Sequence, residues 1–196
     1  DNQGANCVAI GDQAGQIGQG VGSVAIGLLA GQTSQSADSV AIGNGAGAST
    51  QGTDSVAIGT GSGYTGQGYD SVAIGYQAGY NSQDYKSVAI GYQAGYSRQR
   101  NEAVAIGYNA GRSQQGIGTV SIGAWSSYNS GNGFYNVAIG QFTGYVSQQG
   151  NAVAIGVNAG FQGQRNYAVA LGYFAGSISQ GPYCVVIGND AGESRQ

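Results

Sequence analysis

The sequence lacks histidine and methionine altogether, and it holds one proline, one tryptophan and two cysteines among 196 residues. Charged residues make up only 8% of the chain, and its nine acids are spread along it. Acid–base catalysis and metal-assisted hydrolysis usually rely on histidine or on clustered carboxylates. The sequence has no histidine and no cluster of acids, so it has few of the side chains that these reactions need. We therefore expect no enzymatic activity, no catalytic residue and no cofactor.

Long apolar runs and clustered basic residues are missing as well. No stretch approaches the roughly 18 apolar residues that cross a bilayer. The six Lys and Arg residues are scattered, which leaves no basic face for nucleic acid or anionic lipid. We expect neither nucleic acid nor membrane insertion among the partners.

Glycine, in contrast, is abundant. The 39 Gly residues recur in every part of the chain, and each would cost roughly 1 kcal/mol in a helix interior. This composition argues against a helical fold. Gly does not stand at every third position, so collagen is excluded. Val and Ile recur at a fixed spacing, which is not expected of a disordered tract, so disorder is also disfavoured.

One element explains that spacing. Val-Ala-Ile-Gly, or a variant of it by one residue, recurs every 16 residues except for one step of 17, from Val120 to Val137. A strict period of this length is typical of a solenoid. The sequence predicts an all-β fold, a single parallel β-solenoid (β-roll) domain over residues 1–196 with about 12 coils. The copies begin near Val8, Val24, Val40, Val56, Val72, Val88, Val104, Val120, Val137, Val153, Val169 and Val185.

Each copy alternates like a strand that ends in a glycine turn. We expect Val and Ile to point into the coil, and Ser and Ala to point outward. The outward Ala residues would then form an apolar strip suited to packing against another chain, which predicts a homo-oligomer. These are Ala9, Ala25, Ala41, Ala57, Ala73, Ala89, Ala105, Ala138, Ala154 and Ala170.

A glutamine stands eleven residues after the Val in all copies but one. Its amide both donates and accepts, so stacked copies can bond along the rod as a ladder. The alternative is that Gln merely tolerates a solvated turn. The residues are Gln19, Gln35, Gln51, Gln67, Gln83, Gln99, Gln115, Gln148, Gln164, Gln180 and Gln196.

Three acids share the position two residues before the Val: Asp38, Asp54 and Asp70. Solvated edge charges are the simpler interpretation, and a weak calcium site is the alternative. No other metal site is expected.

Aromatic residues gather at two positions of the copy. The first tyrosine row, four residues after the Val, holds Tyr76, Tyr92, Tyr108 and Tyr173. The second tyrosine row, eight residues after it, holds Tyr64, Tyr80, Tyr96, Tyr128, Tyr145 and Phe161. Stacked rings can bury one another, and the functional alternatives are that they bind sugars or form lateral contacts between fibres.

The irregular copy from Val120 to Asn136 adds one residue and has Gly131 where the Gln is expected. It carries Trp125, Tyr128 and Phe134, so it is the best candidate for a specific contact, although an outward bulge without a function is also compatible. The possible binding surface comprises Trp125, Tyr128, Phe134, Tyr76, Tyr92 and Tyr108.

The two cysteines, Cys7 and Cys184, stand directly before the Val in the first and last copies. Within one rod they are too far apart for a disulfide. If one chain stacks on the end of the next they become neighbours, so an inter-subunit disulfide is expected; lateral Cys7 pairing and free thiols are the alternatives. The repeat reaches both ends without a cap, which predicts either a longer array or head-to-tail stacking.

The element Ser-Val-Ala-Ile-Gly at 23–27, 39–43, 55–59, 71–75 and 87–91 resembles the head repeats of YadA-like trimeric autotransporter adhesins. That resemblance implies a left-handed parallel β-roll, three chains in one obligate trimer with the Val-Ala-Ile strands facing its core, and adhesion to host matrix or cells. Ala-Ile-Gly-Tyr-Gln-Ala-Gly, at 73–79 and 89–95, is also similar to repeats of giant-virus and phage fibre proteins.

Three functions follow from these patterns. The first is a self-assembling extracellular fibre of stacked subunits, and the second is an adhesin or viral fibre head that binds glycans or a host surface. An ice-binding solenoid is third, because no face carries a regular Thr array. The expected location is extracellular, or the surface of a cell or virion.

Overall fold

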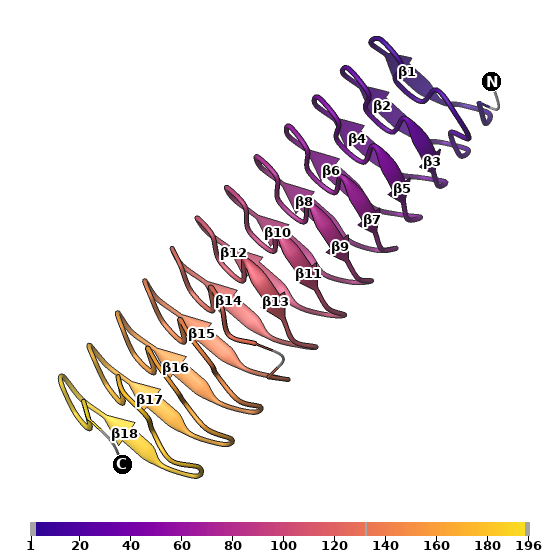
Figure 1. Ribbon diagram of the computed structural model, residues 1–196. Helices are drawn as coiled ribbons and strands as arrows, with labels where there is room; N and C mark the ends of the chain where they lie inside the picture. The colour runs from indigo at the N-terminus through magenta and orange to yellow at the C-terminus, as the bar shows by residue number, and fades with distance from the viewer. Residues whose placement is uncertain (1–2, 132, 195–196) are drawn as a thin grey trace.

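A computed structural model describes residues 3–131 and 133–194. The chain winds into an elongated rod of stacked coils (Figure 1). Each Val-Ala-Ile element forms one short strand, and twelve of them build a parallel sheet along the rod. The first sheet contains β1 (Val8–Ile10), β2 (Val24–Ile26), β4 (Val40–Ile42), β6 (Val56–Ile58), β8 (Val72–Ile74), β10 (Val88–Ile90), β12 (Val104–Ile106), β14 (Val120–Ile122), β15 (Val137–Ile139), β16 (Val153–Ile155), β17 (Val169–Leu171) and β18 (Val185–Ile187).

A second parallel sheet of six strands lies on another side of the coil, in the N-terminal part of the rod. It contains β3 (Thr33–Gln35), β5 (Ser49–Gln51), β7 (Thr65–Gln67), β9 (Asn81–Gln83), β11 (Ser97–Gln99) and β13 (Ser113–Gln115). Beyond β13 the coils pair on this side only through isolated bridges, such as Asn129 with Val146. The predicted all-β parallel solenoid with a 16-residue repeat is confirmed.

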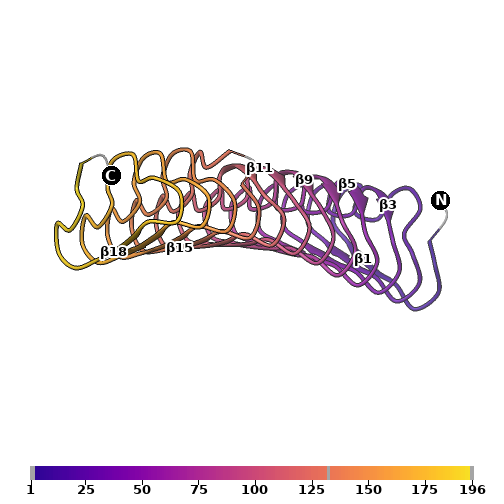
Figure 2. The same ribbon diagram turned by 90° about the horizontal axis from the view of Figure 1, so that it is seen from below.

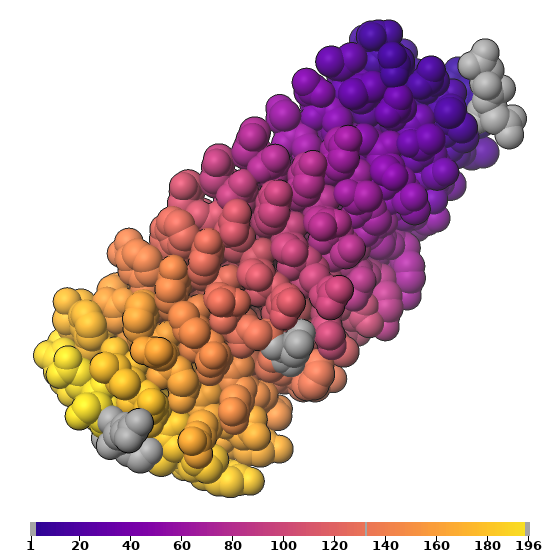
Figure 3. Space-filling view, viewed as in Figure 1, coloured from indigo at the N-terminus to yellow at the C-terminus, as the bar shows by residue number. Residues whose placement is uncertain are grey.

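Like residues stack on like residues. Val88 pairs with Val104 and Ile90 with Ile106, and the same register holds along the first sheet. The extra residue of the irregular copy does not shift it, because Val120 still pairs with Val137. Figure 2 shows the resulting rod bending gently along its length, and Figure 3 shows its elongated surface.

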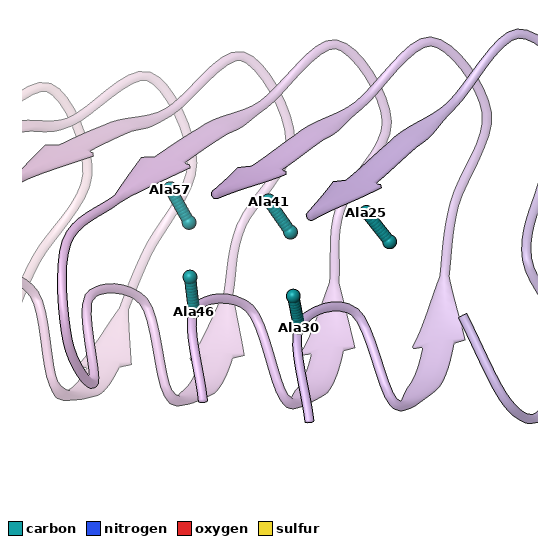
Figure 4. Close-up of a cluster of buried hydrophobic side chains, with 5 residues drawn as sticks. All are labelled: Ala25, Ala30, Ala41, Ala46 and Ala57. Carbon is teal, nitrogen blue, oxygen red and sulfur yellow. The ribbon is translucent and has the colours of Figure 1, made fainter. Parts of the chain in front are cut away.

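The strands alternate as expected, but the expected sides were wrong. Ala25, Ala41 and Ala57 point inward, are 0% exposed, and face Ala30 and Ala46 across the interior (Figure 4). Val and Ile lie on the outside. Apart from Ala9 in the end strand, the row of alanines that we expected to face a partner is the core itself.

A narrow coil explains this reversal. A Cβ atom added to Gly63 would lie 3.3 Å from the Cβ of Ala57 on the facing wall. At that separation the interior has room for methyl groups but not for branched side chains. Burial of Val and Ile in the interior is therefore excluded by volume, since protein interiors tolerate little overpacking.

Glutamine fills the remaining interior. The Nε2 atom of Gln83 donates to the carbonyl oxygens of Val72, at 2.9 Å, and Ser87, at 3.2 Å, within its own coil. Every described Gln of the row makes this pair of bonds. Bonds between copies join only some neighbours, for example Gln83 to Gln99 at 3.3 Å and Gln148 to Gln164 at 2.9 Å. The row therefore works mainly as a brace across each coil; Gln196 lies outside the described residues.

The glutamine brace leaves room only for glycine at one position of the coil. A Cβ on Gly79, whose φ is +55°, would lie 2.6 Å from the Oε1 atom of Gln83. The glycine that ends each strand is required by the neighbouring copy instead, because a Cβ on Gly75 would lie 2.6 Å from the carbonyl oxygen of Gly91. Both positions need glycine for space as well as for φ.

Across the part of the chain that the structure covers, no helix is long and apolar enough to cross a membrane.

Candidate functional site

The outer side of the first sheet presents an apolar surface. The Val–Ile face, defined as the outward Val and Ile (or Leu171) side chains of its twelve strands, runs the length of the rod. Along β10 these side chains are half-buried by their neighbours in the adjacent copies, while the alanine between them is fully buried. Ile58 and Ile155 are 36% and 39% exposed. A continuous apolar surface of this kind is typical of an interface.

The second tyrosine row is a continuous stack. The rings of Tyr64 and Tyr80 lie 5.0 Å apart, and those of Tyr80 and Tyr96 lie 5.1 Å apart, with interplanar angles of 6° and 5°. The stack resumes after one copy, where Tyr145 lies 5.2 Å from both Tyr128 and Phe161. Burial by its neighbours raises the pKa of the Tyr80 phenol, and nearby tyrosines add to that effect.

Arg112 fills the gap in that stack. Its guanidinium carbon lies 5.0 Å from the Tyr96 ring centroid and 5.6 Å from that of Tyr128. The guanidinium also donates to the Tyr128 hydroxyl at 3.3 Å and to Gln93 Oε1 at 3.2 Å. Cation–π contacts thus replace ring stacking and keep the row continuous.

The first tyrosine row runs beside it. Tyr92 lies 5.2 Å from Tyr76 and 4.9 Å from Tyr108, ring to ring. Tyr173 belongs to the same position but packs edge-on against Phe174 at 4.6 Å, away from the other three.

Trp125 joins the two rows. Its ring lies 5.4 Å from Tyr108 and 4.9 Å from Tyr128, and 6.3 Å from Phe142 in the next copy. Five of the six residues of the possible binding surface therefore belong to one connected aromatic surface. Phe134 does not: its ring lies under the Arg100 guanidinium, 5.9 Å away, on another side of the coil.

The interior of the irregular copy is hydrogen-bonded to the copies on either side. Ser121 stands where other copies have the buried alanine, and its Oγ atom accepts from Gln115 Nε2 at 2.9 Å. Asn136 donates to the Gln148 carbonyl oxygen at 3.2 Å and accepts from the Ala152 amide at 3.0 Å. The interior of this copy therefore keeps its hydrogen bonds to the neighbouring copies, and the extra residue changes mainly the surface of the rod.

Sequence reasoning missed two residues that occupy the same position of the copy as Trp125. Phe142 and Asn158 stand five residues after their Val, and with Tyr145 and Phe161 they line a hollow of about 340 Å³. The signal that could have found them is the change from amide to aromatic residues at this position, which begins at Trp125 and is interrupted by Asn158.

Two larger hollows, of about 710 and 660 Å³, lie on another side of the rod and share Ser147 and Gln149. Arg165 is the one charged residue that lines either of them, among the residues described.

The acidic row does not form a cluster. Asp38, Asp54 and Asp70 all occupy turns with φ near +55°. Within residues 3–131 and 133–194, no group of three or more His, Cys, Asp or Glu residues is placed to hold a metal ion. Weak calcium binding by these acids stays a prediction. Thermal melting curves recorded with and without a chelator test it, and identical curves would exclude it.

The cysteines directly precede β1 and β18, the two strands at opposite ends of the rod (Figure 1). Both are half-buried and unpaired in the single chain, and Cys7 Sγ donates to the Gly20 carbonyl oxygen at 2.8 Å. Their position is that of the fully buried Ser87, so their side chains belong to the coil interior.

Comparison with known families gives a match within this architecture. Residues 35–62 match the family model of the YadA head domain repeat, in two copies. Over these residues the chain is similar to YadA head repeats. The matched residues include β4, β5 and β6, and their strand element recurs in register along the first sheet. In the YadA-like repeats of this chain, Ala41 and Ala57 are buried, and the Val–Ile face is outside. No curated protein matches the chain.

Proposed function

We propose that this rod is the head of a non-enzymatic, adhesin-type surface protein, assembled as a homo-oligomer through its Val–Ile face. The observation that carries the proposal is that face, together with the YadA-like repeats. The YadA likeness implies three chains. An extracellular location, on a cell surface, follows from the same likeness.

The energy of assembly is favourable on this geometry. Each of the twelve strands offers two outward apolar side chains. If each contributes about 1 kcal/mol when a partner covers it, the face contributes about 20 kcal/mol. Association costs about 4–15 kcal/mol, so the surplus favours a stable oligomer.

Adhesion is assigned to the surfaces left free by assembly. The connected aromatic surface around Trp125 is exposed in part; Tyr76, Tyr92 and Tyr108 are 46%, 43% and 48% exposed. Glycans or proteins of a cell surface are the proposed partners, and a glycan array together with matrix-coated plates tests for them.

The oligomer is tested by light scattering after size-exclusion chromatography. Replacing Val72, Val88, Ile74 and Ile90 by Thr keeps the strand propensity but removes apolar contact. We expect the wild-type mass to be a multiple of one chain and the variant to dissociate more readily on dilution. As a matched control, Ser97→Thr with Ser113→Thr on the second sheet should leave the mass unchanged. A wild-type rod that stays monomeric at micromolar concentration would refute the assembly.

A self-assembling filament is the second candidate, and it uses the ends of the rod instead of the Val–Ile face. The sequence-identical pairing of neighbouring copies favours it, because an end strand offers the same side chains to another end. Electron microscopy separates the two: an adhesin head forms rods of fixed length, whereas a filament lengthens with concentration.

A further inference from the structure

We propose that the hollow lined by Phe142, Tyr145, Asn158 and Phe161, called here the aromatic hollow, binds one pyranose ring of a neutral glycan. The inference rests on the proposed adhesive function for its role, but its chemistry requires only the folded rod.

The hollow arises from one missing ring. The turn row, defined as the residues five positions after each Val, carries Trp125, Phe142 and Phe174 in the C-terminal part of the rod. Asn158 stands between the two phenylalanines and is shorter than either. Below it the rings of Tyr145 and Phe161 stack at 5.2 Å with an interplanar angle of 1°, so they form the floor of the hollow with their ring edges. The ring of Phe142 is inclined by 70° to that of Tyr145, so it is the ring of the lining that can offer a face.

An asparagine in this row does not suffice to open a hollow. Asn109 occupies the same row next to Trp125, but it is only 3% exposed. Asn158 is half-buried, and its side-chain amide makes no hydrogen bond to another described residue. Asn158 therefore offers one donor group and one acceptor beside the aromatic floor.

The aromatic residues of the turn row adopt a costly backbone conformation. Gln77 and Gln93 have φ of 51° and 49°, and Trp125 and Phe142 have φ of 61° and 54° in the same row. Bulky residues in the left-handed region cost on the order of 1–2 kcal/mol, and such strain persists at functional sites. Leu29 in the same row, with φ of 58°, and Tyr135, Tyr167 and Tyr183 in another row share the conformation, so it belongs to the repeat and does not by itself mark the hollow.

The side chains that line the hollow favour one class of ligand, a neutral sugar. A pyranose ring has an apolar face of C–H groups, which packs on an aromatic ring, and hydroxyls at its edge, which bond an amide. Among the residues that the structure describes, no charged side chain lines the hollow. The nearest cation of the aromatic rows, Arg112, is held between Tyr96 and Tyr128. A carboxylated or sulfated sugar would find no counter-ion, so a neutral sugar is favoured.

Saturation-transfer NMR on the full chain tests the site, with lactose and the trimer of N-acetylglucosamine as probes and sialyllactose as the acidic counterpart. We expect transfer to the C–H protons of one ring face in at least one neutral probe. The single tryptophan, 6.3 Å from Phe142, gives a second readout through its fluorescence.

Asn158→Phe fills the hollow with the side chain that Phe142 and Phe174 already place in the same row, so the fold accepts it. We expect sugar binding to weaken by at least about tenfold. Asp190→Phe adds an exposed ring in the same row outside the hollow and should leave binding unchanged. Phe161→Ser, which reproduces Ser177 of the next copy, removes part of the floor and should also abolish binding.

Absence of transfer to every neutral probe, or equal binding in Asn158→Phe and wild type, would overturn the proposal. So would preferential binding of an aromatic peptide to the same hollow. Light scattering on the same samples separates the two proposals: an intact oligomer without sugar binding refutes the glycan site alone, and binding by a monomer refutes the assembly alone.

Discussion

At the scale of single residues, buried glutamine holds the coil closed. Ten glutamines of the row are at most 2% exposed, and they are the largest fully buried side chains. Buried amides stabilise only when they are bonded. Each of these glutamines donates across its own coil, whereas Oε1 of Gln35, Gln51 and Gln67 accepts no bond from the described residues.

Replacing Gln83 and Gln99 by Leu should therefore destabilise the rod. The carbonyl oxygens of Val72 and Val88 would each lose a donor, at a cost of about 1–3 kcal/mol per site. Thermal unfolding followed by circular dichroism checks the fall in melting temperature. Gln13→Leu is the control, because Leu29 already occupies that position in the next copy. An unchanged melting temperature in the double variant would contradict the bracing role.

Tyr80 should make stability fall in alkaline solution. Its pKa is raised from 10.0, mainly by burial and then by Tyr64, Tyr96 and Tyr76. Because the pKa is raised in the folded chain, the unfolded chain loses this proton at a lower pH. The contribution of Tyr80 to the free energy of unfolding is therefore complete below pH 10 and is lost as pH rises through the folded pKa. Denaturant unfolding at pH 9 and pH 11 measures the loss. Tyr80→Phe should make it smaller; an identical loss in the variant would assign it elsewhere.

At the scale of elements, the sequence period predicted strand positions and register, because sequence repeats map directly on stacked copies. It could not predict which side of the strand faces inward. Val-Ala-Ile alternates either way, and the decision depends on the distance between walls, which the facing Ala57 and Gly63 set.

The candidate site was predictable in part for a similar reason. The two tyrosine rows follow from period alone, and their stacking was expected. The connection through Trp125 and the hollow beside Asn158 depend on the path of the turn in three dimensions, since the residues come from neighbouring copies. Phe134 was grouped with Trp125 because it is near in sequence, but the turn carries it to another side.

Arg112 provides the test of the second tyrosine row as one element. Arg112→Ala should lower stability by about 1–2 kcal/mol, because two ring faces lose their cation. Arg112→Tyr should restore most of that loss by completing the stack. Thermal melts of both variants measure the difference. Equal destabilisation by Ala and Tyr would show that the hydrogen bond to Gln93, rather than the row, is what matters.

At the scale of the whole molecule, the end copies carry the two thiols in equivalent interior positions. We propose that stacking of the copy at Val185 on the copy at Val8 of another chain brings them about 5 Å apart, within the range of a disulfide. Non-reducing electrophoresis should then show a ladder of multimers that reductant collapses.

Cys184→Ser should remove that ladder and leave the light-scattering mass of the laterally assembled oligomer unchanged. Monomer alone on non-reducing gels, with both thiols alkylated after denaturation, would exclude the link. A dimer that survives in Cys184→Ser would indicate lateral pairing of Cys7 instead.

The register of the first sheet has a consequence for how such a protein can change. Val72 pairs with Val88 and Val88 with Val104, so each strand meets residues one repeat away on either side. Removal or duplication of one whole repeat would place Val again on Val and Gln again beside Val, with every glycine still where the neighbouring copy needs it. Recombination between repeats can therefore lengthen or shorten the rod one coil at a time, and so alter how far it reaches without redesigning its interior.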